Sequence, residues 1–235
     1  MSKKNAVWIT GASSGIGKAL TIKFSQSDYY VVASSRKTEK IEKYVEELGI
    51  SKKVTILQND ITDFYDLSKK FDELNKNFII DVLINNAGIT SFKPFIENSI
   101  DEINQIFKTN LFGSIYTTHL VLPEMIKNNS GIILNILSVA AKKVFTNSTI
   151  YAASKAGLNQ FSKVLREEIR SNNIRIANVF PGATSTEIWH KSTLEKYSSQ
   201  MMSPKNLAEF IFNIIETDSN IIPEEIVVRP ITGDL

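Results

Sequence analysis

Cysteine is absent from the 235-residue sequence, which excludes disulfides and thiolate metal sites. Histidine is scarce, since only His119 and His190 occur and they lie far apart in the chain. We therefore expect each to be a surface or packing residue, and we predict no metal site. The net charge is only +2 and the basic residues are spread along the chain. Neither nucleic acid nor an anionic membrane is indicated as a partner.

Long apolar runs are also missing. No stretch approaches the roughly 20 apolar residues that a membrane span needs. The first residues, Met1-Ser2-Lys3-Lys4, lead into a short strand-like run and not into the apolar region of a signal peptide. From these absences we expect a cytoplasmic protein without membrane contact.

The sequence does contain a regular alternation of two patterns. Apolar runs typical of buried strands lie at 5–10, 29–33, 54–57, 81–84, 131–137, 174–180 and 225–228. Helical patterns lie roughly at 15–27, 38–48, 63–75, 100–127, 151–171 and 204–217. This alternation predicts one α/β domain over 1–235, a Rossmann-like, doubly wound parallel sheet of about seven strands with helices on both faces.

Three glycines follow the first predicted strand. Gly11, Gly15 and Gly17 lead into apolar positions 16, 19, 20 and 24, which have helical spacing, so the glycines occupy a strand-to-helix turn. Gly11 can take a positive φ. Gly15 lets a diphosphate approach the backbone, Gly17 lets helix and strand pack closely, and the N–H groups at the helix start attract phosphate. A dinucleotide site is predicted here, with a tight turn of small residues as the alternative.

A phenol and an ammonium are spaced for one helix face. Tyr151 and Lys155 stand four residues apart, which is one helical turn. A free tyrosine has a pKa of about 10, too high for easy proton exchange at pH 7, and a nearby cation lowers it. Ser138, thirteen positions upstream, could hold a substrate oxygen beside the phenol. The pair alone is also compatible with an ordinary exposed helix pair.

The second predicted strand ends without an acidic residue. Ser34-Ser35-Arg36-Lys37 stands where NAD-preferring enzymes often carry a carboxylate for the ribose hydroxyl, and the first acid is Glu39. Arginine binds phosphate through a planar fork. We therefore predict NADP(H) over NAD(H), with NAD(H) still possible. The alternative is that Arg36 and Lys37 only solvate the helix start.

Taken together, these motifs resemble the short-chain dehydrogenase/reductase family. The family's cofactor loop reads T-G-x-x-x-G-x-G, which 10–17 match as they stand. The other family marks follow in order: Asn85-Asn86-Ala87-Gly88, Asn110, Ser138, Tyr151, Lys155, Pro181-Gly182 and Thr186. The resemblance implies an oxidoreductase that transfers hydride between NADP(H) and a carbonyl or alcohol substrate. It places the cofactor part at about 5–137 and the catalytic and substrate part at about 138–235.

The resemblance also implies roles for residues. Tyr151 is the general acid or base, Lys155 lowers its pKa and Ser138 bonds the carbonyl oxygen. Asn110 holds a water that resupplies the proton, or else is a polar residue that disturbs a long helix. The implied cofactor contacts are Gly11, Ser13, Ser14, Gly15, Ile16, Gly17, Arg36, Asp60, Ile61, Asn86, Ala87, Gly88, Tyr151, Lys155, Pro181, Gly182 and Thr186. Asp60, which would contact the adenine, is equally a candidate N-cap for the helix near 63. Asn85 is expected to tie neighbouring strands together.

The substrate is not determined by the sequence. Two segments are expected to shape its pocket, 140–150 with Val144, Phe145 and Asn147, and 187–203 with Trp189 and further aromatic and Met residues. The second segment is a candidate mobile lid. A 3-oxoacyl thioester, a 3-hydroxy acid, a sugar and a small ketone all remain open.

Two other functions are compatible with parts of this pattern. The alternative is a catalytically idle NADP-binding sensor or partner-binding protein on the same fold, which commonly loses the Tyr or the Lys, whereas this chain keeps both Tyr151 and Lys155. A sugar epimerase or dehydratase would need a larger C-terminal region and a different glycine spacing. The resemblance implies a homodimer or homotetramer formed through the helices near 100–127 and 151–171. The tail at 229–235 is not helical in pattern and is either docked near a subunit contact or frayed.

Overall fold

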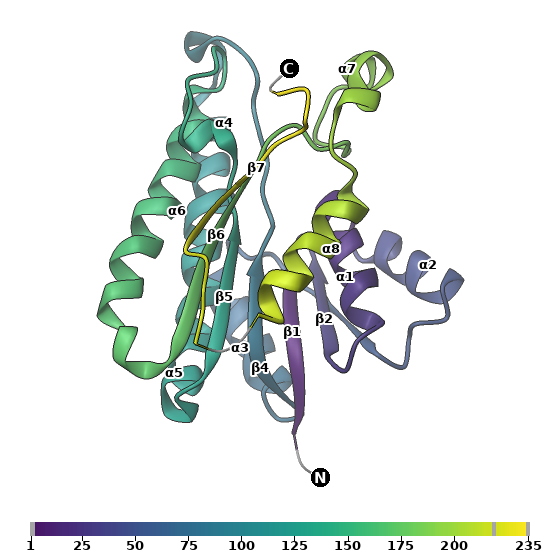
Figure 1. Ribbon diagram of the computed structural model, residues 1–235, viewed down its shortest axis with the longest axis vertical. Coiled ribbons are helices and arrows are strands. Elements are labelled where there is room, and N and C mark those ends of the chain that lie inside the picture. Colours follow the sequence, from purple (N-terminus) through teal and green to yellow (C-terminus); the bar gives the residue numbers. More distant parts are fainter. Residues whose placement is uncertain (1–2, 218–219, 234–235) are drawn as a thin grey trace.

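Seven strands pair in parallel in one sheet, in the order β3-β2-β1-β4-β5-β6-β7 (Figure 1). The computed structural model describes residues 3–217 and 220–233, so residues 1–2 and the last two residues of the tail at 229–235 lie outside the described residues. The strands are β1 (Lys4–Thr10), β2 (Tyr30–Ser35), β3 (Val54–Gln58), β4 (Phe78–Asn85), β5 (Gly131–Ile136), β6 (Ile174–Pro181) and β7 (Glu225–Val228). The predicted fold class is confirmed.

Helices cover both faces of this sheet (Figure 1). They are α1 (Gly15–Ser25), α2 (Glu39–Glu47), α3 (Phe64–Leu74), α4 (Ile100–Phe107), α5 (Gly113–Asn128), α6 (Thr149–Glu168), α7 (Lys191–Tyr197) and α8 (Pro204–Ile215). Short 3₁₀ turns lie at η1 (Phe95–Glu97), η3 (Val139–Ala141), η4 (Arg170–Asn172) and η5 (Ser198–Gln200), and η2 (Lys108–Phe112) is a π-helix.

Two apolar layers hold these helices to the sheet. Side chains alternate across a strand, so Val7 and Ile9 of β1 face one layer while Ala6 and Trp8 face the other. The first layer contains apolar residues of α1, α2 and α8, and the second contains those of α3 and α5. Because both faces are covered, the strands are almost continuously apolar, as the sequence pattern indicated.

Parallel strands end at the same edge of the sheet, and this positions the site. β1 and β4 are neighbours although two strands intervene in sequence. The chain winds one way from β1 through β3 and the other way from β4 onward. Ligand sites in such sheets form beyond the carboxyl ends of the strands at this switch point.

Two local expectations need correction, and the candidate lid segment contains a helix that the sequence pattern did not indicate. The helix predicted over 100–127 is interrupted by the π-helix η2, which contains Asn110. Helix α7 forms within the segment that was expected to be a lid, and His190 caps it by accepting from the Ser192 N–H. Asp60 does not cap the helix near 63, since Asp63 is the N-cap and accepts from the Asp66 N–H.

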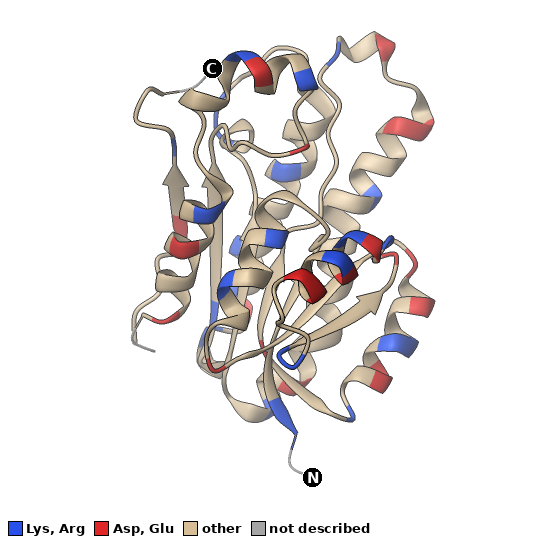
Figure 2. Ribbon diagram, turned by 90° about the vertical axis from the view of Figure 1, so that its right-hand side faces the viewer, with Lys and Arg blue, Asp and Glu red and all other residues tan. Residues whose placement is uncertain are grey.

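Basic and acidic residues are interspersed along the helices in the ribbon view of Figure 2. Within the described ranges 3–217 and 220–233, no helix has the length and apolar character required to cross a membrane. The same residues contain no group of three or more His, Asp or Glu side chains placed to hold a metal ion.

Candidate active site

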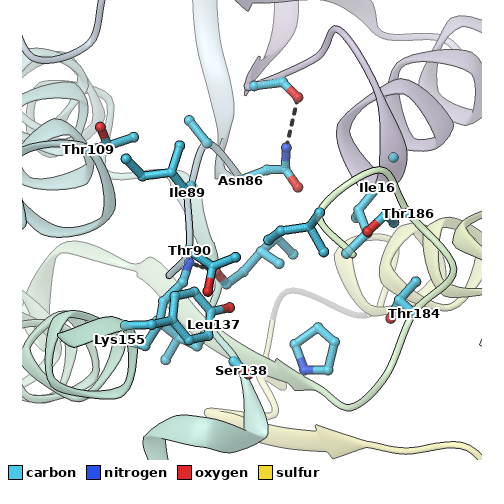
Figure 3. Close-up of a pocket in the computed structure, with 18 of the residues that line it drawn as sticks. Ile16, Asn86, Ile89, Thr90, Thr109, Leu137, Ser138, Lys155, Thr184 and Thr186 are labelled. Atoms are coloured by element: carbon cyan, nitrogen blue, oxygen red, sulfur yellow. Dashed lines mark hydrogen bonds between the residues drawn. The ribbon is translucent and has the colours of Figure 1, made fainter. Parts of the chain in front are cut away.

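A cavity of about 770 Å³ opens at the carboxyl edge of the sheet. It is lined by segments that follow all six strands from β1 to β6. Every residue that the sequence analysis singled out as catalytic or cofactor-binding lines it, apart from Gly17 and Asn110. Figure 3 shows Ile16 and Thr186 on one side of this space and Ser138 and Lys155 on the other.

The glycine-rich turn lies against neighbouring backbone with no room for side chains. Gly11 has φ +67° and Gly15 has φ +54°, conformations that glycine adopts without steric cost. A Cβ on Gly17 would stand 2.2 Å from the Gly11 carbonyl oxygen and 2.5 Å from Asn86 Nδ2. Gly17 is therefore a packing residue below the cavity floor, while Gly15 leaves backbone exposed to the cavity beside Thr186.

Asn86 fixes the point at which β1 and β4 diverge. Its Nδ2 donates to the carbonyl oxygens of Thr10 at 2.8 Å and Gly11 at 3.1 Å. In return, the Thr10 hydroxyl oxygen accepts from the backbone N–H groups of Asn86 and Ala87, both at 3.0 Å. These reciprocal bonds hold the glycine turn and the segment after β4 in one fixed arrangement, which forms the floor of the cavity.

Ser138, Tyr151 and Lys155 come together beside this floor. Ser138 follows β5, and the other two lie in the first turns of α6. Tyr151 is 8% exposed and Lys155 is 4% exposed. Lys155 Nζ donates to the Ile136 carbonyl oxygen at 2.7 Å and lies 6.0 Å from the centre of the Tyr151 ring. The predicted phenol, ammonium and hydroxyl therefore share one buried corner.

Burial dominates the titration of this corner. It raises the pKa of Tyr151 above its ordinary value, although a hydrogen bond with the Ser138 side chain lowers it in part. Burial also lowers the pKa of Lys155 to about 8. Burial of the phenol outweighs the Ser138 hydrogen bond, and the lowering of the pKa of Tyr151 by Lys155 stays a prediction.

Asn110 lies behind Lys155, fully buried in the π-helix. Its Oδ1 accepts from the Ile89 N–H at 2.8 Å, and its Nδ2 donates to the Ile89 carbonyl at 2.9 Å and to Ser154 Oγ at 3.0 Å. The side chain thus ties three segments together: η2, the stretch after β4, and α6. Its predicted role in holding a water stays a prediction.

Arg36 and Asp60 occupy the opposite end of the cavity. Arg36 is exposed and lines the wall just after β2, as the sequence predicted. Asp60 Oδ1 accepts from the Thr62 backbone N–H at 2.9 Å and from the Thr62 hydroxyl at 2.8 Å. Across this end, Lys40 of α2 pairs with Glu187 of the segment after β6 at 2.6 Å.

Three cavity residues that sequence reasoning missed carry polar atoms without partners. Among the described residues, the side-chain atoms of Asn59, Thr90 and Thr109 are buried and make no hydrogen bond. All three residues line the cavity. A buried polar group without a partner is costly, so these atoms point to a polar ligand. The only sequence signals were that Asn59 directly follows β3 and that Thr109 precedes Asn110, and Thr90 had none.

Phe92 and Trp189 form an aromatic wall of the cavity, of which the sequence indicated only Trp189. Phe92 stacks on Trp189, with ring centres 5.3 Å apart and planes 11° apart. The same ring meets the edge of Tyr151 at 6.1 Å. Trp189 is held in place because its Nε1 donates to the Thr184 carbonyl at 3.0 Å. Trp189 was expected near the substrate, whereas Phe92 lies in a loop with no helical or strand pattern to single it out.

Comparison with known proteins gives a consistent result. A family model described as "short chain dehydrogenase" matches residues 5–196. The chain is 32% identical to a sepiapterin reductase of Chlorobaculum tepidum over 99% of this chain and 98% of that one. It is 31% identical to an NADP-dependent 3-hydroxy acid dehydrogenase of Schizosaccharomyces pombe, over 95% of this chain and 92% of that one.

The fold agrees as closely. A closed form of serine dehydrogenase complexed with NADP⁺ superposes with a TM-score of 0.89 at 25% identity, covering 98% of this chain and 96% of that one. The residues matched by the family model, 5–196, include the glycine turn, the cavity lining and the Ser138, Tyr151 and Lys155 corner. The chain therefore belongs to the short-chain dehydrogenase family.

Proposed function

We propose that this protein is an NADP(H)-dependent oxidoreductase that interconverts a carbonyl compound and its alcohol, with Tyr151 as general acid and base. One observation carries the proposal: a single cavity joins the glycine-rich turn to the buried corner of Ser138, Tyr151 and Lys155. The names of an NADP-dependent relative and of a neighbour complexed with NADP⁺ support the choice of cofactor.

The cavity fits such a cofactor at both ends. Backbone N–H groups of the glycine turn, at the start of α1, suit a diphosphate. The side-chain polar atoms of Asn59 and Thr109, which are buried without a hydrogen bond, offer partners to the cofactor. Asn86, Ala87 and Gly88 would line the adenosine ribose, and Asp60 and Ile61 the adenine. Pro181, Gly182 and Thr186 would hold the nicotinamide end.

When bound, NADPH supplies a hydride, and the protein supplies position and a proton. Ser138 Oγ would donate to the carbonyl oxygen and hold it beside the phenol. As negative charge develops on that oxygen, Tyr151 gives it the phenolic proton, so a C–H and an O–H bond form and a phenolate remains. The raised pKa of Tyr151 keeps the proton on the phenol until it is needed. The charged Lys155 stabilises the phenolate that is left.

The phenol is tested with Tyr151→Phe. We expect kcat for carbonyl reduction to fall by about 10²-fold to 10⁴-fold, the range for loss of a positioned acid, while the Kd for NADPH stays near that of the wild type. Tyr65→Phe is the matched control, because Tyr65 is 88% exposed and outside the cavity. NADPH oxidation at 340 nm against diketones, aldehydes and keto sugars gives the rate. Substantial turnover by Tyr151→Phe would contradict the mechanism.

The choice of NADP(H) is tested with Arg36→Ala. We expect the KM for NADPH to rise about tenfold to a hundredfold, as for loss of a charge-assisted hydrogen-bond pair, and the KM for NADH to change little. Lys37→Ala is the control, because Lys37 is exposed but does not line the cavity. Equal KM values for NADPH and NADH in the wild type, unchanged by Arg36→Ala, would contradict the proposed preference for NADP(H).

A further inference from the structure

The charges around the cavity limit the substrate that it can hold. Of the described residues that line it, only Arg36 and Lys155 are cationic, and only Asp60 and Glu187 are acidic. Arg36 follows β2, three strands away from β5, or roughly 14 Å at the usual strand spacing. It therefore stands far from the carbonyl that Ser138 and Tyr151 would hold.

Lys155 is not placed to meet a substrate anion either. It is buried, donates to the Ile136 carbonyl, and lies 3.4 Å from where a Cβ of Gly88 would stand. This puts the ammonium beside the segment after β4 and leaves the aromatic wall, Phe92 and Trp189, as the other lining near the phenol.

Two lysines that lie close in sequence to the substrate end of the cavity form ion pairs with glutamates that do not line the cavity. Lys93 Nζ pairs with Glu102 at 2.7 Å, and Lys142 Nζ pairs with Glu225 at 2.5 Å. Lys143 is exposed and does not line the cavity. Glu187, which does line the cavity, is acidic and pairs with Lys40 at 2.6 Å, so this pair supplies no uncommitted cation either. A carboxylate or phosphate placed beside Tyr151 would lose water and gain no cation in return, which is unfavourable.

The groups that do face the substrate are flat, apolar or neutral. Phe92 touches the edge of the Tyr151 ring, and the stacked Phe92 and Trp189 present parallel rings. Such rings favour a planar group next to the reacting carbonyl. The orphaned Thr90 hydroxyl lies on the same side of the cavity as Ser138 and Lys155 in Figure 3. It can bond a second neutral oxygen of the substrate.

We propose that the substrate is an uncharged carbonyl compound with a flat apolar group beside the C=O, and not a keto acid or hydroxy acid. This rests on the proposed function, whose chemistry it narrows. It also separates the chain from relatives and neighbours whose names state a hydroxy acid or serine, both of which carry a carboxylate.

The test uses two probes that share a phenyl ketone and differ in charge, 1-phenyl-1,2-propanedione and phenylglyoxylate. Binding to the NADP⁺-loaded protein is read by quenching of tryptophan fluorescence, with Trp189→Phe to assign the signal, because Trp8 is fully buried. NADPH oxidation is measured in parallel. We expect the dione to quench Trp189 and to exceed phenylglyoxylate in affinity and kcat/KM by at least about tenfold, since an unpaired buried charge is costly.

Variants of the wall provide a second readout. Phe92→Leu is expected to raise the Kd and KM for the dione severalfold with little change in the Kd for NADPH. Phe95→Leu is the control, because Phe95 is 55% exposed and does not line the cavity.

The outcomes separate the two proposals. Equal or tighter binding of phenylglyoxylate, or no quenching of Trp189 by either probe, would overturn the substrate inference. Tyr151-dependent reduction of phenylglyoxylate at the higher kcat/KM would overturn it too, while the proposed function stands. Selective binding of the dione without reduction of any carbonyl by NADPH would uphold the charge preference and count against the proposed function.

Discussion

Lys155 shows how function can work against stability at a single residue. Its pKa in the folded protein, about 8, lies below the ordinary 10.5. The fold therefore disfavours the charged form, and Lys155 costs stability at all pH values below about 8. This cost is relieved as pH rises toward the unfolded pKa. Because the proposed mechanism uses the charged form of Lys155, the folded protein is less stable below about pH 8 than it would be without this buried charge.

We accordingly expect Lys155→Met to abolish turnover and to raise the free energy of unfolding at pH 7 by about 1–3 kcal/mol, after allowing for the lost bond to Ile136. The gain should vanish near pH 10. Urea denaturation at both pH values measures it. Lys163→Met is the control, because Lys163 is partly exposed and pairs with Glu225 at the surface. A destabilised Lys155→Met protein at pH 7 would mean that the hydrogen bond outweighs desolvation.

At the scale of elements, an asparagine ladder joins the carboxyl halves of three strands. Asn85 Nδ2 donates to Asn135 Oδ1 at 2.9 Å, and Asn135 Nδ2 donates to Asn178 Oδ1 at 3.0 Å. These residues are register partners on β4, β5 and β6 and are almost fully buried. The expectation that Asn85 ties neighbouring strands together agrees with these contacts. On β5, the ladder residue Asn135 directly precedes Ile136, whose carbonyl oxygen accepts from Lys155 Nζ.

Removing the middle rung breaks the bonds of Asn135 to Asn85, Asn178 and Ser162, although Asn85 Nδ2 still donates to Thr118 Oγ1 at 3.2 Å. We expect Asn135→Ala to lower the free energy of unfolding by about 2–4 kcal/mol, given the cost of unsatisfied buried polar groups. Asn159→Ala removes only the last acceptor, which takes a bond from Asn178 at 2.9 Å, and should cost less than half as much. Urea denaturation ranks the two. Equal losses would show that the ladder is not a connected network.

Some of these elements could be predicted from the sequence and others could not. Strands were predictable because apolar runs report burial directly, and the glycine turn because φ and close packing demand glycine. The π-helix was not, since Asn110 is stabilised by Ile89 and Ser154, which are remote in sequence. Asp60 and Asp63 are equivalent as caps by type, and only the path of the chain decides between them. Phe92 meets Trp189 through tertiary packing alone.

The shared cavity is a property of the whole molecule, because β1 to β6 each deliver one part of it. The position of a catalytic side chain thus depends on global folding. The expected dimer or tetramer stays a prediction, as does the mobility of 187–203.

Global stability also depends on a group far from the cavity. Asp81 of β4 is half-buried, and its Oδ2 makes no hydrogen bond among the described residues.

Asp81 should make the stability of the whole protein fall as pH rises through its titration. Burial, helped by the nearby charge of Glu124, raises its pKa from 3.8 to about 6. A raised acid pKa favours the protonated fold, so this stabilisation is complete below about pH 4 and is lost between pH 4 and 6. Asp81→Asn mimics the neutral form. We expect it to raise the free energy of unfolding at pH 7.5 by about 1–2 kcal/mol, discounted for partial exposure, and to have no effect at pH 4.

Thermal and urea unfolding of Asp81→Asn at pH 4, 5.5 and 7.5 follow this dependence. Asp72→Asn, an exposed change on α3, serves as the control and should match the wild type throughout. Because Asp81 lies at the opposite end of the sheet from the cavity, kcat should not change. An Asp81→Asn protein that is less stable at pH 7.5 would show that the carboxylate is stabilised by a partner in solution. Its charge would then support the fold.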